Sequence, residues 1–305
     1  MKSSFFTLLF TIFYRLVFSQ IDTSYKQIVG TNYRIIIPSN FTASTKFMGF
    51  QDEEKVASIM YNEMPTPVSN LENAFTPAAL KNQGMTWISK ENIEMKSGKK
   101  ATLLYVSQKM SGIVFYKHIL IFGDDKKTVL LVGIFPEDYQ ELSQPIKMSL
   151  QSALYDENLN ANPLDAVDFQ VNTEGTTFKF AKSLSGALIY TTDGLLPTQS
   201  ADSASIMISN SLSKIVVKDK KEYAIKRLTM IKEYENAKLV AIDSVLINGV
   251  EGYEIEAEIK NELVYFVMLF TKNEDYVLYF ATATNHVAEH LASFKKIVRT
   301  LTLKH

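Results

Sequence analysis

The sequence predicts an α+β protein made of two tandem domains, each built on an antiparallel β-sheet. Three observations lead to this fold class. The two halves of the chain resemble each other, short β-rich runs alternate with closely spaced turns, and a helical pattern closes each half. A length of 305 residues is also what two domains of ordinary size require.

The resemblance between the halves takes the form of a constant offset. Residues 115–154 lie over residues 264–303 without a gap, at a shift of 149 residues. The tetrapeptide Ala-Ser-Ile-Met also occurs twice, at 57–60 and at 204–207. Such self-similarity is the signature of a duplicated unit, so we expect the same order of elements in both copies.

A polar segment separates the copies. Residues 156–165 are rich in Asp and Asn and show no hydrophobic periodicity, which is typical of a linker. The predicted organisation is a signal peptide at 1–19, a first α+β domain at 20–155, this linker, and a second α+β domain at 166–305.

The first copy is expected to begin with strands and a short helix. Thr76 can cap that helix with Pro77 in its first position, and Gly84 can end it. Four β-rich runs follow, and the turns between them are short enough to favour an antiparallel meander. The expected strands of this copy are 33–37, 56–62, 87–95, 101–110, 113–122 and 128–135.

A helix is expected at the end of each copy. One apolar stripe of the second copy should face the sheet, because its members recur at spacings of three and four: Val287, Leu291, Phe294, Ile297 or Val298, and Leu301. In the first copy Pro145 is expected to start the corresponding helix, because proline is tolerated in a first helical turn but not in a helix interior.

The opening strand of the first copy carries a family resemblance. The segment Tyr33-Arg-Ile-Ile-Ile-Pro38-Ser-Asn-Phe41 resembles the first strand and Pro-containing turn of the PsbP-like α+β fold, which is shared with Ran-binding nuclear import factors. The meander and closing helix extend the resemblance over nearly all of the mature chain, although the second copy has Phe178-Lys179-Phe180 without the proline. The resemblance implies helices packed on the faces of each sheet and a non-catalytic role in binding or stabilising a larger assembly.

The N-terminus has the pattern of an export signal. Lys2 supplies a positive charge, residues 5–14 form a short apolar run, and Ser19 is a suitable residue before a cleavage site. Arg15 interrupts a stretch already too short to span a bilayer. We predict cleavage after Ser19 and a periplasmic or secreted protein that does not span the membrane after cleavage.

Composition excludes several classes of partner and site. The 32 Lys and Arg are balanced by 33 Asp and Glu, so nucleic acid is not an expected partner. The chain has no cysteine, which excludes disulfides, thiolate metal sites and a cysteine nucleophile. No cofactor-binding fingerprint is present, and we predict no cofactor and no catalytic residues.

One short motif points to metal chemistry. His286-Val287-Ala288-Glu289-His290 fits the H-x-x-E-H pattern of inverted zincins, in which His286 and His290 would bind zinc and Glu289 would act as base. Such a site needs a third protein ligand, and the only later histidine is the terminal His305. The competing interpretation places both histidines at the solvated edge of the helix, beside the apolar stripe.

The function that the sequence favours is therefore non-enzymatic. We expect an exported binding or accessory protein that presents a surface, or the groove between its two copies, to a protein partner or small ligand. The alternative is a zinc-dependent hydrolase that uses residues 286–290. The abundance of Tyr and Phe, 15 and 19 residues, is compatible with a binding site but is mostly expected to form sheet core.

Overall fold

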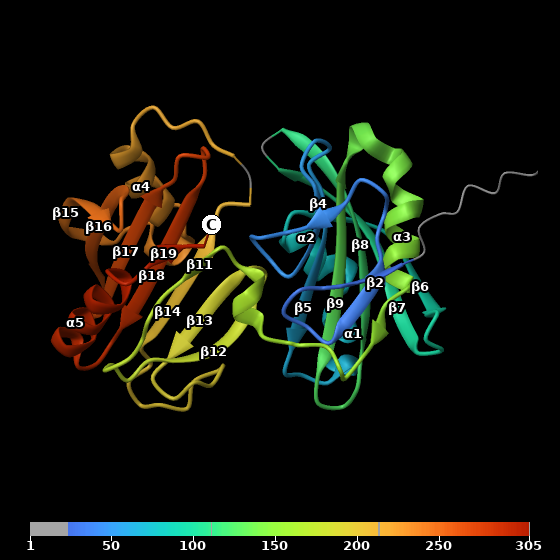
Figure 1. Ribbon diagram of the computed structural model, residues 1–305, viewed down its shortest axis with the longest axis horizontal. Coiled ribbons are helices and arrows are strands. Elements are labelled where there is room, and N and C mark those ends of the chain that lie inside the picture. Colours follow the sequence, from blue (N-terminus) through green and yellow to red (C-terminus); the bar gives the residue numbers. More distant parts are fainter. Residues whose placement is uncertain (1–23, 111, 213, 305) are drawn as a thin grey trace, which may run out of the picture.

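The computed structural model describes residues 24–110, 112–212 and 214–304, which form two α+β units (Figure 1). Each unit contains one seven-stranded sheet. The expected signal peptide at 1–19 lies outside the described residues and stays a prediction. None of the helices in the described part of the chain is long and apolar enough to cross a membrane.

The first sheet is antiparallel between all neighbouring strands. The meander expected from the spacing of turns forms its β6 to β9 half, with strand ends within about two residues of those predicted. In spatial order the strands are β3 (Thr42–Ala43), β4 (Gly49–Asp52), β5 (Ala57–Met64), β9 (Thr128–Pro136), β8 (Ile113–Gly123), β7 (Lys100–Met110) and β6 (Met85–Glu94).

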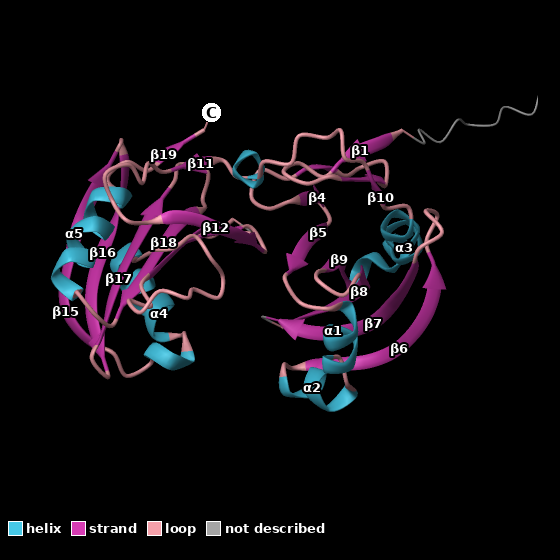
Figure 2. Ribbon diagram, turned by 90° about the horizontal axis from the view of Figure 1, so that it is seen from below, coloured by secondary structure: helices cyan, strands magenta, loops and turns pink. Residues whose placement is uncertain are grey.

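Helices cover both faces of this sheet, and Figure 2 shows α2 and α3 on opposite sides of it. Helices α1 (Val68–Ala74) and α2 (Pro77–Asn82) lie on one face. The Thr76 hydroxyl accepts a hydrogen bond from the backbone N–H of Ala79 at 3.2 Å, which confirms the predicted cap. Helix α3 (Ser143–Gln151) follows a 3₁₀ turn (Glu137–Leu142) and covers the other face.

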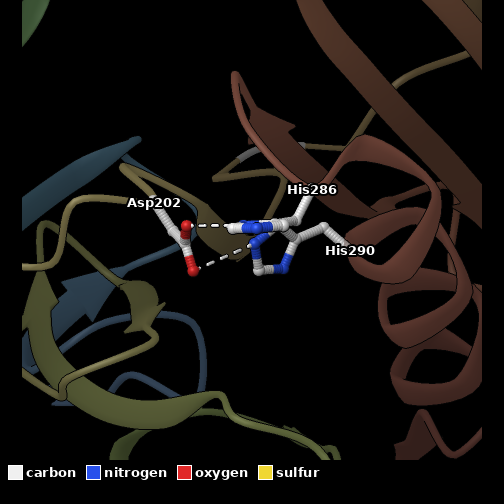
Figure 3. Close-up of side chains that lie close together, drawn as sticks. All are labelled: Asp202, His286 and His290. Atoms are coloured by element: carbon white, nitrogen blue, oxygen red, sulfur yellow. Dashed lines mark hydrogen bonds and ion pairs between the residues drawn. The ribbon is translucent and has the colours of Figure 1, made fainter.

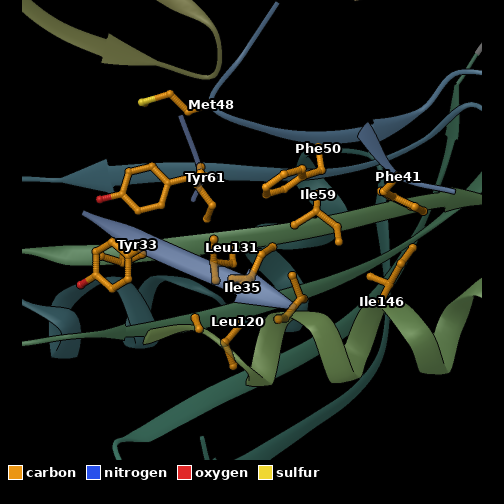
Figure 4. Packing of buried hydrophobic residues seen from close by; sticks show 14 of the residues in the cluster. Tyr33, Ile35, Phe41, Met48, Phe50, Ile59, Tyr61, Leu120, Leu131 and Ile146 are labelled. Carbon is orange, nitrogen blue, oxygen red and sulfur yellow. The ribbon is translucent and has the colours of Figure 1, made fainter. Parts of the chain in front are cut away.

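Helix α3 begins two residues before Pro145, which lies in its first turn rather than at its start. Its apolar side packs into the main core of the first copy, to which Ile146 of α3 and the sheet residues Ile59, Leu120 and Leu131 all belong (Figure 4). The expected opening strand forms as β2 (Tyr33–Ile36), but it pairs with β1 (Tyr25–Gln27) and β10 (Leu154–Tyr155) in a small separate sheet.

The second copy repeats this architecture. Helix α5 (Val287–Val298) packs on one face of its sheet and α4 (Lys220–Thr229) on the other. A two-stranded sheet joins β11 (Phe169–Gln170) to β19 (Thr302–Leu303), and 3₁₀ turns occur at Pro163–Ala166 and Lys232–Tyr234. In spatial order the strands of the main sheet are β12 (Lys179–Leu184), β13 (Ala187–Thr191), β14 (Ser205–Asn210), β18 (Tyr276–Ala283), β17 (Glu262–Phe270), β16 (Val250–Ile259) and β15 (Lys238–Ile247). The predicted fold class is confirmed.

The alignment of the two copies at a constant shift of 149 residues is wrong beyond the hairpin that joins β8 to β9 in the first copy and β17 to β18 in the second. Ile121 pairs with Leu130 in the first copy, whereas Phe270, its counterpart at the shift of 149, pairs with Tyr276. Eight residues therefore separate the paired positions in the first copy and five in the second. The buried faces of the paired strands are the same in both copies, so the three-residue difference lies in the turns between β8 and β9 and between β17 and β18.

The closing helices also correspond at a different shift. The buried Ile146 and Leu150 of α3 are matched by the buried Phe294 and Val298 of α5, a shift of 148 residues. At a shift of 149, Met148 would match the fully buried Ile297, yet Met148 is 57% exposed. Burial, rather than side-chain similarity, thus determines how the copies correspond.

The copies contact each other through the turn between β12 and β13. The side-chain oxygen of Asn62 accepts hydrogen bonds from the backbone N–H and the hydroxyl of Ser185, at 2.7 and 3.0 Å. Gly186 adopts a φ of 82°, and a Cβ there would lie 2.4 Å from the carbonyl oxygen of Lys46. The ammonium of Lys46 pairs with Asp275 of the second copy at 3.3 Å.

The segment predicted as the linker is hydrogen-bonded to the first copy. Asp156 donates its backbone N–H to the carbonyl of Asn32 at 2.8 Å, and the Asn32 amide donates to the carbonyl of Leu159 at 3.0 Å. The Gln27 amide donates to the carbonyl of Asn160 at 2.7 Å. Hydrogen bonds of this kind fix the segment along the small sheet, while the division at 156–165 itself stays a prediction.

Candidate functional site

The two histidines of the H-x-x-E-H motif lie at the start of α5. His286 is the N-cap residue and adopts a left-handed conformation with φ 47°, so it stands just outside the helix. The backbone of His286, rather than the helical repeat, therefore sets the direction of its imidazole. His290 lies within the first turns of α5 and its ring packs edge-on against Phe178 and parallel to Phe294.

A carboxylate from a distant loop meets both histidines (Figure 3). Asp202 belongs to the connection between β13 and β14, 84 residues before His286. One of its oxygens lies 2.8 Å from Nδ1 of His286, and the other lies 3.7 Å from Nε2 of His290. Among the described residues these three side chains place one ligand atom each within 4.8 Å of one another.

The two histidines differ sharply in burial. The side chain of His286 is 62% exposed, and its hydrogen bond and charge interaction with Asp202 raise its pKa. His290 is only 5% exposed, so the interpretation that it forms a solvated edge is wrong. Nε2 of His290 is buried without a hydrogen-bond partner in the described structure.

Glu289, the base of the hydrolase alternative, is not part of this group. Its side chain is exposed on α5, and it does not belong to the set of ligand atoms formed by Asp202, His286 and His290. A general base must come within hydrogen-bond reach of the water it activates. The geometry therefore brings together metal-ligating residues but not the expected base.

The loop that carries Asp202 is organised by a second carboxylate, Asp193. Desolvation raises the pKa of the Asp193 carboxyl, but the hydrogen bonds it accepts outweigh this effect and hold its pKa well below the usual range. Its donors are the backbone N–H groups of Leu195, Gln199 and Ser200 and the hydroxyls of Thr191 and Thr198. Such a network fixes the loop before it reaches Asp202.

A second candidate site lies between the copies, in the region where the sequence predicts a binding groove. A pocket of about 320 Å³ is bounded by β12 of the second copy and by the small sheet and β5 of the first. Its aromatic wall includes Tyr33, Tyr61, Tyr155 and Phe180. Ring centroids of Tyr33 lie 5.5 Å from Tyr61 and 5.4 Å from Tyr155, so the first-copy part of this wall is continuous.

The charged residues of the pocket are two lysines and one glutamate. Glu63 accepts hydrogen bonds from the hydroxyl of Tyr61 at 3.0 Å and from the ammonium of Lys127 at 3.2 Å. Burial and the Glu63 charge raise the pKa of Tyr61 far above its usual value, so its hydroxyl remains a donor. Burial also raises the pKa of Tyr33, to about 12.

Lys182 is the unbalanced charge in this pocket. It is half-buried on β12, and within the described part of the chain no carboxylate lies within 4.0 Å of its ammonium. Burial lowers its pKa, an effect that the nearby Glu63 opposes and Lys127 reinforces. The pocket thus combines an aromatic wall with one positive charge that has no direct counter-ion.

Sequence reasoning missed Asp202, Asp193 and Lys182 as site residues. Asp202 lies in an irregular polar loop, and only the antiparallel pairing of β14 with β18 brings that loop to the start of α5. No local spacing signals such a meeting. Lys182 is one lysine among many along the chain, and its burial depends on how the copies dock.

Comparison with known proteins places the chain near several solved structures. No protein-family model matches the sequence, and the search of curated proteins found no match. Among solved structures, cyanobacterial PsbP from Synechocystis aligns with 43% of this chain and 91% of its own, with 11% identity and a TM-score of 0.32. A PsbP protein, the namesake of the fold that the sequence resembles, is thus among the similar solved structures.

Two further similar structures span both copies. A chain of the Tle4–Tli4 complex covers 92% of this chain and 97% of its own, with 9% identity and a TM-score of 0.36. The T6SS immunity protein TplEi from Pseudomonas aeruginosa, complexed with "L" peptide, covers 92% and 99%, with 9% identity and a TM-score of 0.34. At this level of similarity, the function has to be argued from the residues of this chain.

Proposed function

We propose that this protein is an exported, non-enzymatic binding protein whose inter-domain pocket receives a carboxylate side chain of a protein partner. The observation that carries the proposal is Lys182, a half-buried ammonium without a direct counter-ion in a pocket lined by both copies. An incoming carboxylate would pair with a charge that is already partly desolvated, which makes the new hydrogen bond stronger than one formed in water.

The remaining walls of the pocket support a protein partner. Tyr is enriched among the residues that dominate protein interfaces, and Tyr33, Tyr61 and Tyr155 provide a rigid aromatic surface of this kind. The ammonium of Lys127 is already paired with Glu63, so we expect the incoming carboxylate to bind Lys182 instead. A volume of about 320 Å³ lies at the lower end of the range for ligand pockets, which argues against a large cofactor and leaves room for a side chain of a partner.

The hydrolase alternative receives less support. Asp202 supplies the third ligand that the motif lacked, but Glu289 is exposed and lies outside the ligand group. Because Glu289 lies outside the ligand group, the described residues do not place the base that the motif requires beside the metal-ligating atoms. A binding role therefore accounts for more of the described side chains than hydrolysis does.

The proposal is tested with peptide arrays and two matched variants. Peptides containing Asp or Glu, and the same peptides with Asn or Gln instead, are screened for binding by fluorescence anisotropy. Lys182→Gln should weaken binding of the acidic peptides at least about tenfold, because it removes the charge that pairs with the carboxylate. Lys179→Gln, an exposed position on the same strand, should leave it unchanged.

Three results would count against this function. The first is equal binding of acidic and amide peptides, and the second is equal affinity of the wild type and the Lys182→Gln variant for the acidic ones. An absence of binding by every acidic peptide would also count against a carboxylate partner. If acidic peptides bind the wild type and bind Lys182→Gln more weakly, affinity capture from the native envelope with the same two variants identifies the natural partner.

A further inference from the structure

The side chains of Asp202, His286 and His290 form a cluster that an ion pair only partly explains (Figure 3). The 2.8 Å contact between Asp202 and His286 is an ordinary surface ion pair near a helix N-terminus, where a carboxylate is favoured. This ion pair does not explain why His290 lies buried beside it. A buried imidazole nitrogen without a partner, however, costs free energy and needs its own explanation.

The position of His290 supplies that explanation. Its Nε2 is buried, has no hydrogen-bond partner among the described residues, and lies 3.7 Å from the Asp202 carboxylate. That distance is too long for a hydrogen bond. It is close to the separation of about 3.3 to 3.5 Å between two ligand atoms on one tetrahedral zinc ion, given bond lengths of about 2.0 to 2.2 Å. The 2.8 Å contact between Asp202 and His286 is shorter than this separation, so a bound ion would replace that hydrogen bond and move the two atoms apart.

The types of ligand indicate which ion fits. Two imidazoles and one carboxylate are ligands of zinc and related transition ions, whereas calcium and magnesium prefer sites made of oxygen atoms alone. Three protein ligands leave one position for water, and the exposed side of this site is the imidazole of His286. Asp202 also offsets the charge of a cation held near the start of α5.

We propose that Asp202, His286 and His290 form a zinc site that fastens the β13–β14 loop to the start of α5. The loop is already held there by the Asn285 amide, which donates to the carbonyl of Ala201 at 3.1 Å. Asp193 is a positioning residue, because its hydrogen bonds fix the loop before it reaches Asp202. The site is separate from the inter-domain pocket and independent of the proposed binding function.

Binding is measured directly on the full mature chain. The protein is stripped with a chelator, and the affinity for Zn²⁺ alone is determined by isothermal titration calorimetry. Co²⁺ in place of Zn²⁺ reports through the intensity of its visible absorption whether the ion is four-coordinate, and the ligand variants identify the side chains. Stoichiometric zinc, an increase in the melting temperature on zinc addition, and reversal by chelator are the expected results.

Three variants assign the ligands. Asp202→Asn and His290→Gln should each weaken zinc binding at least about tenfold and abolish the increase in melting temperature. Glu289→Gln is the matched control in the same motif and should bind zinc like the wild type. Zinc uptake by the wild type tests the site by itself, even if a ligand variant folds poorly.

Some outcomes refute the site. If the chelated wild type takes up no zinc, or if its affinity is unchanged by Asp202→Asn and His290→Gln, the cluster is an ion pair and nothing more. If Glu289→Gln weakens zinc binding as much as His290→Gln, the ion is held by the motif in another arrangement. In that case the assignment of Asp202 as third ligand is wrong.

Discussion

Replacing His118 by Phe should remove an acid-induced loss of stability from the first copy. His118 lies on β8 with 5% exposure, and its ring stacks on Tyr105 at 4.5 Å between centroids. Nε2 contacts the Ser143 hydroxyl at 2.9 Å, whereas Nδ1 is buried without a partner in the described structure. Protonation would place a charge in this stack.

The magnitude follows from the pKa of this residue. The pKa of His118 is lowered from 6.5 to about 4, mainly by burial and also by the charge of Lys147, while the charge of Glu91 opposes the shift. Between pH 6.5 and 4 the unfolded state therefore binds a proton that the folded state does not. The free energy of unfolding should fall by about 3 kcal/mol as the pH drops through this window, because a proton bound only by the unfolded state costs about 1.4 kcal/mol for each step of one in pH.

The single tryptophan makes the assay specific for the first copy. Trp87 lies on β6 of the same sheet, so its fluorescence follows unfolding of that copy in urea. Urea unfolding of wild type and His118→Phe is measured at intervals from about pH 7 to about pH 4, which brackets the window of His118 titration. The variant should lack the part of the acid loss due to His118, while the carboxylate contributions cancel in the comparison. Parallel curves for the two proteins would show that His118 does not titrate in this way.

Three further substitutions test the packing. Gly133→Ala should cost about 1 to 3 kcal/mol in urea unfolding, because a Cβ would lie 2.1 Å from Cγ2 of Ile146; an unchanged midpoint contradicts this. Tyr279→Phe should cost about 1 kcal/mol by calorimetry through loss of its hydroxyl bond to the carbonyl of Phe294, and an unaltered melting profile argues against that bond. Gly186→Ala should loosen the contact between copies and raise the radius of gyration in X-ray scattering; an identical scattering curve would refute it.

Local patterns were sufficient for the meander and for the α2 cap. Turn spacing placed β6 to β9 within about two residues, and Thr76 caps as the sequence indicates because capping depends only on nearby atoms. Helix α4 was missed, although Asp219 at its N-cap accepts a hydrogen bond from the backbone N–H of Glu222 at 2.8 Å, a pairing visible in the sequence. Its apolar residues are few, so its periodicity was weak.

The candidate sites depend on contacts that no local pattern carries. His290 could be identified from its motif, but its burial follows from how α5 sits on the sheet, with Phe178 and Phe294 around the ring. Asp202 reaches it only through the pairing of β14 with β18. Lys182 lies half-buried in a pocket that both copies line, next to the β12–β13 turn that docks on the first copy. Long-range pairing therefore determines both sites.

The two sites share one hairpin, which raises the question of whether they influence each other. Lys182 pairs with Ile189 across the hairpin, and the Asp202 loop begins after β13 ends at Thr191. The two side chains have no common partner among the described residues, and substitutions without shared partners usually act additively. A Lys182→Gln, Asp202→Asn double variant should therefore lose acidic-peptide binding by the same factor as Lys182→Gln alone, with and without zinc. If zinc alters peptide affinity in the wild type but not in Asp202→Asn, the hairpin couples the sites, and independence of the two functions is wrong.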